Sequence, residues 1–276
     1  MLLDITQLEK EIYYQKLKEL LKEMGHNFCV GFWGQPDQKT MDILVENNYH
    51  FIDLDVPQNY FKTGYIPTTT CHIIQDIISN AFILKDKLDF FIATTGNDKC
   101  EQGYNVARIL ADEGFPVINA TNTNNNPIRP CLISNAAIPL KTRVARIMEL
   151  TYKPLTKEEE AYYASHQITV PAFIFHGVPP RDLSILDNFP LNTRIEGWTK
   201  LVELGIPGRQ DLEWQISTDI PTVFFTQSFC HKELLAAYWA RQIGGLHIEA
   251  HNTITHSTEA KLQAYLGLAG QIFIKE

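Results

Sequence analysis

Runs of apolar and polar residues alternate along the chain in a way that predicts strands and helices in turn. Apolar side chains recur at helical spacing over residues 4–24, and residues 28–33 are apolar almost throughout, as in a strand buried on both faces. A helix over 39–48 and a strand over 50–55 follow. Strands that alternate with helices form parallel sheets with right-handed crossovers, so we expect an α/β fold with a Rossmann-like parallel sheet and a second α/β half.

The same alternation continues to the end of the chain, without a strong internal repeat in the sequence. We place a domain boundary near residue 150, so that residues 1–150 form an N-terminal helix plus a Rossmann-like nucleoside-binding domain and residues 151–276 form a second α/β domain. Further helices are expected over 71–85, 103–113, 141–164, 234–243 and 259–268, and further strands over 88–93, 116–120, 171–175, 193–198, 221–226 and 246–251.

Charge and composition narrow the classes of function. The net charge is −8 and there is no long basic run, so we expect no nucleic-acid partner. No apolar run approaches the roughly 18 residues of a membrane span, and the first residues do not form a signal peptide. The five cysteines are scattered without a Cys-x-x-Cys pair, which is typical of reduced thiols. These features predict a cytoplasmic protein without a membrane partner.

A glycine turn follows the first predicted strand. Gly31 lies in this strand, Gly34 and Gln35 follow it before the next helix, and the second strand ends in Asp53 and Asp55. Nucleotide-binding α/β domains begin in this order: the glycines let the backbone approach a ligand, and the terminal acid accepts hydrogen bonds from ribose hydroxyls. We therefore predict that these five residues bind a cofactor, although a turn that binds nothing has the same pattern.

The glycine turn also indicates which cofactor to expect. A dinucleotide loop needs a third glycine, whereas Trp33 and Pro36 occupy this loop, and Pro36 lacks a backbone amide. A pyrophosphate needs close backbone approach and several amides, so the loop favours a nucleoside cofactor such as S-adenosylmethionine over NAD.

Polar residues also follow the other predicted strands. Ligands of open parallel sheets bind outside the carboxyl ends of the strands, so these residues are expected to converge at one edge. Asn, Thr and Gly are common in turns, so no single loop predicts a binding site. The prediction depends on several such loops meeting at one edge. The cofactor-binding candidates here are Thr95 and Gly96, and the substrate-binding candidates are Asn122, Asn124, His176, Arg181, Gln227 and Ser228.

His231 is the candidate catalytic residue. It follows Cys230 in a turn between a strand and a helix, where a thiol beside a histidine can have a lowered pKa. The chain has no Gly-x-Ser-x-Gly elbow, and residues adjacent in sequence rarely point at each other. A general base or substrate-binding role for His231 is therefore favoured over nucleophilic catalysis.

The predicted strand 246–251 is the best candidate for a metal site. His247, Glu249 and His251 alternate and share one face of the strand, where two imidazoles and a carboxylate can bind zinc or iron. A half-buried strand with a polar outer face shows the same alternation. Without further ligands we favour this second interpretation and expect no metal.

Three segments carry a resemblance to a known family: 31–34, 177–184 and 226–232. In them the chain resembles the S-adenosylmethionine-dependent C-methyltransferases of the guanylylpyridinol cofactor, a small family from the maturation of the iron-only hydrogenase. The resemblance covers most of the chain and transfers no catalytic residue. It implies a Rossmann-like homo-oligomer that methylates a ring carbon of a small heteroaromatic, pyridinol-like substrate in cofactor biosynthesis.

Three functions stay open on the sequence alone. The first is this methyltransferase, in which an electron-rich ring carbon attacks the sulfonium methyl group. The second is an NAD(P)-dependent oxidoreductase on the same fold, which the acids at the second strand support and the glycine turn opposes. The third is a non-catalytic protein that binds a small molecule without turnover.

Overall fold

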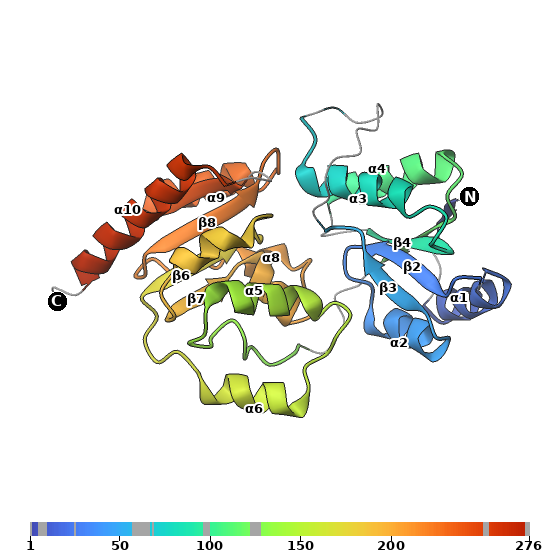
Figure 1. Cartoon of the computed structure of the whole chain (residues 1–276), viewed down its shortest axis with the longest axis horizontal. Coiled ribbons are helices and arrows are strands. Elements are labelled where there is room, and N and C mark those ends of the chain that lie inside the picture. The colour runs from blue at the N-terminus through green and yellow to red at the C-terminus, as the bar shows by residue number, and fades with distance from the viewer. Residues whose placement is uncertain are drawn as a thin grey trace. The chain divides into compact units, whose positions relative to one another are not determined.

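The protein, seen here as a computed structural model, consists of two compact units, Met1–Asn126 and Pro127–Glu276 (Figure 1). The structure describes residues 2–4, 10–24, 26–56, 67, 69–95, 100–121, 128–250 and 254–273. Each unit has a parallel sheet with helices packed on it. The expected α/β class, a Rossmann-like sheet with a second α/β half, is therefore confirmed.

The first unit has five strands in the order β1-β5-β4-β2-β3, all parallel. Successive residues of the central strands point to opposite faces. Val30 and Phe32 pack with the side chains of α1 and α2, whereas Phe91 and Ala93 pack with those of α3 and α4. The strands are β1 (Leu2–Asp4), β2 (Cys29–Trp33), β3 (His50–Asp53), β4 (Phe90–Thr95) and β5 (Val117–Thr121), and the helices are α1 (Lys10–Met24), α2 (Gln38–Glu46), α3 (His72–Ile83) and α4 (Glu101–Asp112).

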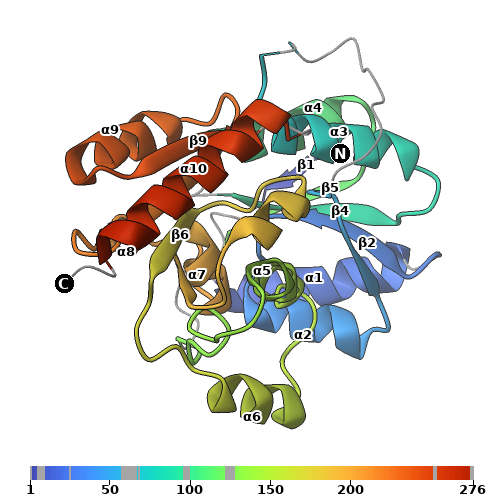
Figure 2. The ribbon, with the colours of Figure 1, turned by 60° about the vertical axis from the view of Figure 1, so that its left-hand side comes forward.

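The second unit has four parallel strands in the order β7-β6-β8-β9. Phe224 packs against α9 on one face, whereas Phe175 and Phe225 join the core formed by α5, η1 and α10 on the other. Figure 2 shows β9 between α9 and α10. The strands are β6 (Phe173–Gly177), β7 (Thr193–Glu196), β8 (Thr222–Gln227) and β9 (Leu246–Ala250), and the helices are α5 (Leu140–Glu149), α6 (Lys157–Ser165), the 3-10 helix η1 (Leu183–Asn188), α7 (Trp198–Glu203), α8 (Gln210–Glu213), α9 (Glu233–Ile243) and α10 (His256–Phe273).

The two sheets share one strand order. β2 to β5 are arranged as β3-β2-β4-β5, and β6 to β9 are arranged in the same way as β7-β6-β8-β9. In each sheet the chain moves from the first strand to one side and then crosses to the other side for the third strand. The neighbouring first and third strands form a topological switch point, and ligands of open α/β sheets bind at the carboxyl ends of such strands.

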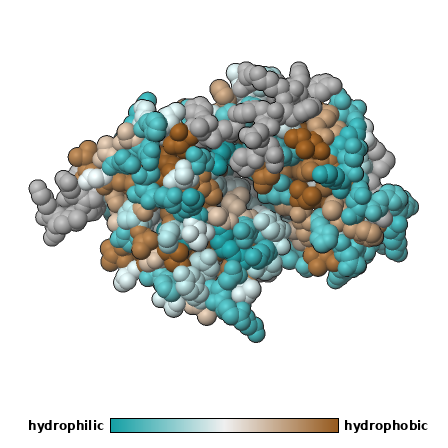
Figure 3. Space-filling view, in the orientation of Figure 1, coloured by the Kyte–Doolittle hydropathy of each residue, from teal (hydrophilic) through white to brown (hydrophobic). Residues whose placement is uncertain are grey.

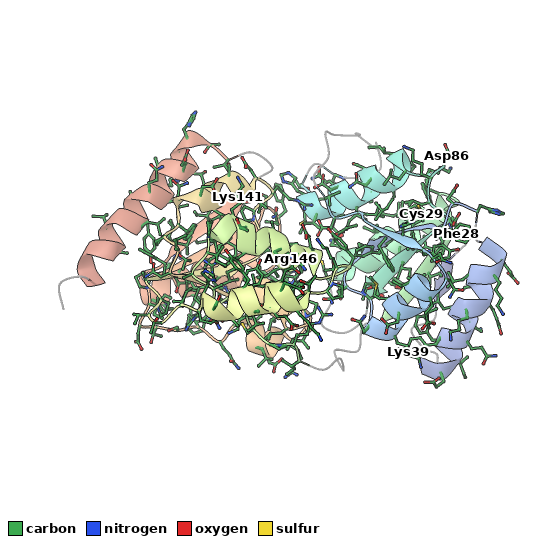
Figure 4. All side chains as sticks on the ribbon, turned by 60° about the horizontal axis from the view of Figure 1, so that its bottom comes forward. Phe28, Cys29, Lys39, Asp86, Lys141 and Arg146 are labelled. Atoms are coloured by element: carbon green, nitrogen blue, oxygen red, sulfur yellow. The ribbon has the colours of Figure 1, made fainter. Side chains whose placement is uncertain are left out.

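The division between the units lies earlier than the residue 150 expected from the sequence. The helix α5 belongs to the second unit, because Val144 and Ile147 pack in the same core as Phe175. The helix expected over 141–164 is instead two helices, α5 and α6, separated by a segment that contains Pro154. Arg146 of α5, labelled in Figure 4, binds Glu159 of α6 with nitrogen–oxygen distances of 2.8 and 2.9 Å.

The N-terminal helix also differs from its expected bounds. It begins at Lys10 rather than at residue 4, because residues 2–4 form β1, which pairs with the edge of β5. Three residues are too few for a visible period-2 pattern, so the sequence could not indicate this strand.

Apolar residues lie in several small groups among polar ones on the face seen in Figure 3. Among the most exposed apolar side chains of the described residues are Leu234 on α9 and Leu268 on α10, at 83% and 67% exposure. Single exposed apolar residues are normal on protein surfaces. Within the described part of the chain, no helix has both the length and the apolar character to span a lipid bilayer.

Candidate functional site

The switch point of the first unit lies where β2 and β4 end side by side. Gly34 follows β2 in the left-handed conformation, with a φ of 67°, which favours glycine. A Cβ atom at this position would lie 3.0 Å from both the Cβ and the carbonyl oxygen of Thr94 at the end of β4. The glycine turn is thus pressed against the neighbouring strand, whereas Gly31 lies inside β2 and packs under Leu88 and Phe91. Gly31 therefore contributes to the core rather than to the edge.

Several polar side chains are buried at this edge. Thr95 donates a hydrogen bond of 2.5 Å to Asn119 of β5, and Gln35 is buried beside the glycine turn. The hydroxyl oxygen of Thr94 is also buried, with the residue 4% exposed, and no described residue makes a hydrogen bond with it. Buried polar atoms normally have a partner, so this hydroxyl indicates a place for a bound polar group.

The expected acidic residues form a fixed turn at the end of β3. The strand ends at Asp53, whose Oδ1 accepts a hydrogen bond of 2.9 Å from the backbone N–H of Asp55. Buried Asn80 of α3 donates to the carbonyl oxygens of Leu54 and Val56, at 2.8 and 2.9 Å. The backbone around Asp55 is therefore held from two sides. The sequence did not indicate the role of Asn80, because its partners lie 24 and 26 residues away.

A carboxylate of the chain itself fills the N-terminus of α2. Asp37 is the N-cap, and its Oδ1 accepts hydrogen bonds from the backbone N–H of Thr40 at 3.0 Å and from the hydroxyl of Tyr14 at 2.8 Å. Its Oδ2 accepts from the hydroxyl of Thr40 at 2.8 Å. Burial and, next, the hydrogen bond to Asp37 raise the pKa of Tyr14. The spacing of Asp37 and Thr40 is a helix-start signal that was visible in the sequence.

The switch point of the second unit lies where β6 and β8 end. Gly177 has a φ of 124°, and a Cβ atom there would collide with the carbonyl oxygen of Phe225. The N–H of Val178 donates to this oxygen at 3.2 Å, and the side-chain amide of Gln227 donates to the carbonyl of Pro179 at 2.7 Å. The loop after β6, which carries half-buried Arg181, is thus held against the end of β8.

The turn after β8 separates buried from exposed side chains. Gln227 and Ser228 are buried, so these two substrate-binding candidates lie inside the unit. Phe229 is 53% exposed and has a φ of 61°, which is uncommon for a residue other than glycine. His231 is also exposed, at the edge of the sheet. Of the candidates in this turn, His231 is thus the one that a molecule in solution can reach.

His176 is an interior residue rather than a surface ligand. Its ring packs against Trp214 and Phe224, with ring centroids 5.2 and 5.0 Å apart. Its Nε2 donates to the carbonyl oxygen of Glu213 at 2.8 Å, so the proton of the neutral ring lies on Nε2. Burial lowers its pKa to about 4, and Nδ1 makes no hydrogen bond with any described residue.

We expect this histidine to make the second unit less stable in acid. The unfolded chain binds a proton on His176 with a pKa near 6.5, whereas the folded chain does so near 4, so the unfolded state holds more protons between these values. Stability should therefore fall by about 3 kcal/mol as the pH decreases from 6.5 to 4. Urea unfolding of wild type and His176→Gln across this range isolates the contribution, because glutamine can still donate to Glu213; equal pH slopes would contradict it.

A small hollow beside His176 contains an ion pair. Lys232, at the start of α9, lies 2.6 and 2.7 Å from the carboxylate oxygens of Glu213, which is buried on α8. Cys230 also lines the hollow. Nothing in the sequence indicated this pair, since its members lie 19 residues apart on separate elements. It links α8 to the turn that carries His231.

The strand β9 contains two of the three residues considered for a metal. The Nε2 atom of His247 lies 2.9 Å from the hydroxyl of Thr226, and burial lowers the pKa of this histidine against the opposing charge of Glu249. Among the described residues no cluster of three or more His, Cys, Asp or Glu could hold a metal ion. The candidates Gly96, Asn122, Asn124 and His251 lie outside the described residues.

Comparison with known proteins gives no family for this chain. No protein-family model matches it, and no curated protein matches it either. Its function is therefore inferred from the two sheet edges: a glycine turn with an acidic turn in the first unit, and the loop after β6 with the turn of His231 in the second.

Proposed function

We propose that this protein is an S-adenosylmethionine-dependent methyltransferase that acts on a small heteroaromatic, pyridinol-like substrate in cofactor biosynthesis. The acidic turn of the first unit carries the proposal. Asp53 accepts the N–H of Asp55, and Asn80 holds the backbone of Leu54 and Val56 on either side of Asp55, at the carboxyl edge where carboxylates can accept the ribose hydroxyls of an adenosine. Gly34 and the buried hydroxyl of Thr94 lie at the same edge.

The second unit is proposed to bind the methyl acceptor. When bound, S-adenosylmethionine would supply an electrophilic methyl group for a ring carbon of the acceptor, with S-adenosylhomocysteine as the leaving group and the proton of that ring carbon released as the ring becomes aromatic again. His231 accepts the proton of the ring hydroxyl, which raises the electron density of the ring. Arg181, in the loop after β6, supplies positive charge for an anionic substituent of the substrate. We further propose that the protein is a cytoplasmic homo-oligomer.

A nicotinamide-dependent oxidoreductase is the second candidate, since an acid at the end of β3 also suits the ribose of NAD. Calorimetry with S-adenosylmethionine and with NAD, in separate titrations, distinguishes the two. We expect S-adenosylmethionine to bind, and transfer of an isotope-labelled methyl group to a hydroxypyridine to follow. Binding of NAD alone would overturn the proposal, and ligand binding without turnover of any tested acceptor would favour the non-catalytic function.

Replacing Asp55 by alanine should weaken the binding of S-adenosylmethionine by roughly 1.5–3 kcal/mol, the range for hydrogen bonds to a charged group. The midpoint of thermal unfolding should change little, because the side chain lies beyond the end of the strand. Asp86→Ala is the matched control, since Asp86 is an exposed acid in the same unit. If Asp53→Ala and Asp55→Ala both leave the affinity unchanged, the ribose assignment is wrong.

A further inference from the structure

We propose that Asp37 sets the class of ligand that the first unit accepts, by excluding nucleotides that carry a phosphate or pyrophosphate at the start of α2. This inference rests on the proposed nucleoside site of the first unit. It assigns that site to uncharged or cationic nucleosides, among them sulfonium nucleosides, and it makes Asp37 a specificity-determining residue.

The position of Asp37 is the first observation. In nucleotide-binding α/β domains the helix after the first strand directs its free N–H groups and its positive dipole end at the phosphates. Here α2 follows β2 through the glycine turn, and the carboxylate of Asp37 accepts the N–H of Thr40 at 3.0 Å. The negative charge that a ligand phosphate would bring is therefore already present in the chain.

The rigidity of this carboxylate is the second observation. Asp37 is 6% exposed and accepts hydrogen bonds from the hydroxyls of Tyr14 and Thr40, both at 2.8 Å. The hydroxyl oxygens of Tyr13 and Thr40 lie 2.8 Å apart, and this hydrogen bond holds the Thr40 hydroxyl in place. Three donors on two elements hold the carboxylate, so it cannot turn away when an anion approaches. A phosphate would meet a fixed like charge that is largely shielded from water, where repulsion is stronger than between exposed charges.

An independent observation points to a place for a ligand at this edge. The hydroxyl of Thr94 is buried and has no hydrogen-bond partner among the described residues. It belongs to the residue against which Gly34 packs, so it lies beside the same turn that leads to Asp37. A hydroxyl can donate to or accept from an uncharged polar group of a ligand. At this edge the hydroxyl of Thr94 can bind an uncharged ligand group, whereas the carboxylate of Asp37 repels anions.

Asp37→Asn tests the proposal, because asparagine caps a helix as well as aspartate does and removes the charge. Calorimetry with adenosine, ADP and inorganic pyrophosphate is made on wild type, on Asp37→Asn and on the control Asp42→Asn, an exposed acid of the same helix. Wild type should bind adenosine at least tenfold more tightly than ADP. Asp37→Asn should reduce this ratio at least tenfold through tighter ADP binding, with the adenosine affinity within twofold of wild type and Asp42→Asn unchanged.

The outcomes separate this inference from the proposed function. If wild type binds adenosine and ADP equally, or if the ratio is the same in Asp37→Asn, the role of Asp37 is refuted while the nucleoside site stands. If wild type binds neither adenosine nor S-adenosylmethionine, the proposed function fails. In that case, pyrophosphate binding by Asp37→Asn but not by wild type would still support the exclusion of anions by Asp37. If Asp37→Asn also fails to bind pyrophosphate, the exclusion is refuted. If Asp37→Asn does not fold, the same titrations are made on Asp37→Ser, which keeps a side-chain oxygen that can cap the helix.

Discussion

Replacing Glu203 by alanine should lower the free energy of unfolding of the second unit by roughly 3–5 kcal/mol, the range for removing one partner of a buried charged network. Its Oε1 accepts the backbone N–H groups of Leu132 and Ile133 at 2.7 and 2.6 Å, and its Oε2 accepts that of Ser134 at 2.9 Å together with the hydroxyl of Ser134. Alanine would leave these buried donors without an acceptor, each at a cost of about 1–3 kcal/mol.

The same substitution would remove a negative charge that favours the charged form of a buried cation. Arg143 is fully buried and donates to the carbonyl oxygens of Ile138, Ser134 and Thr193 at 2.8, 3.1 and 2.6 Å. Burial lowers its pKa to about 10, and the charge of Glu203 acts in the opposite direction. Urea unfolding followed by circular dichroism measures the loss, with Glu160→Ala on the exposed side of α6 as control. Equal midpoints for the two variants would refute this account.

Gly177→Ala should destabilise the second unit by at least about 3 kcal/mol and abolish ligand binding at its sheet edge. The φ of 124° is unfavourable for any residue with a Cβ, and the added atom would collide with the Phe225 carbonyl oxygen. This oxygen already accepts the N–H of Val178, so neither strand can shift without loss of that hydrogen bond. The loop after β6 should therefore lose its position against β8.

Gly244→Ala is the matched control for this prediction. Gly244 lies in the same unit and also has a positive φ, 67°, but a Cβ there would meet no atom within 4 Å. Its substitution should cost only about 1–2 kcal/mol, the price of the left-handed conformation alone. The difference between the two variants, measured by thermal unfolding, isolates the collision with β8. Equal losses would show that the backbone conformation accounts for the whole effect.

The sequence predicted the strands well because their patterns are local. Residues 28–33 are apolar almost throughout and residues 221–226 are rich in β-branched and aromatic residues, as expected for strands covered by helices on both faces, and they are β2 and β8 with bounds shifted by one residue. The same reasoning applies to the candidate His176, which the structure buries. It stands in an otherwise apolar strand, so a position inside the unit was to be expected from its neighbours, and its carboxyl-terminal location in the strand gave it the appearance of a ligand.

Contacts between residues far apart in the sequence could not be predicted from it. Glu203 and its partners are separated by about 70 residues, and amphipathic helices normally turn their charged residues to solvent, so nothing marked Arg143 and Glu203 as buried. The role of Asn80 could not be predicted for the same reason. Asp37, in contrast, carries a local capping signal that competes with the interpretation of 34–37 as an open ligand turn.

If Asp37 excludes anions as proposed, the two tyrosines of α1 give this helix an indirect influence on selectivity. Tyr14 bonds the carboxylate of Asp37, and Tyr13 supports the threonine that bonds it. A substitution at either tyrosine would loosen the carboxylate without changing any residue of the glycine or acidic turn. Tolerance for anionic ligands can therefore drift through natural variation in a helix whose sequence shows no sign of binding anything.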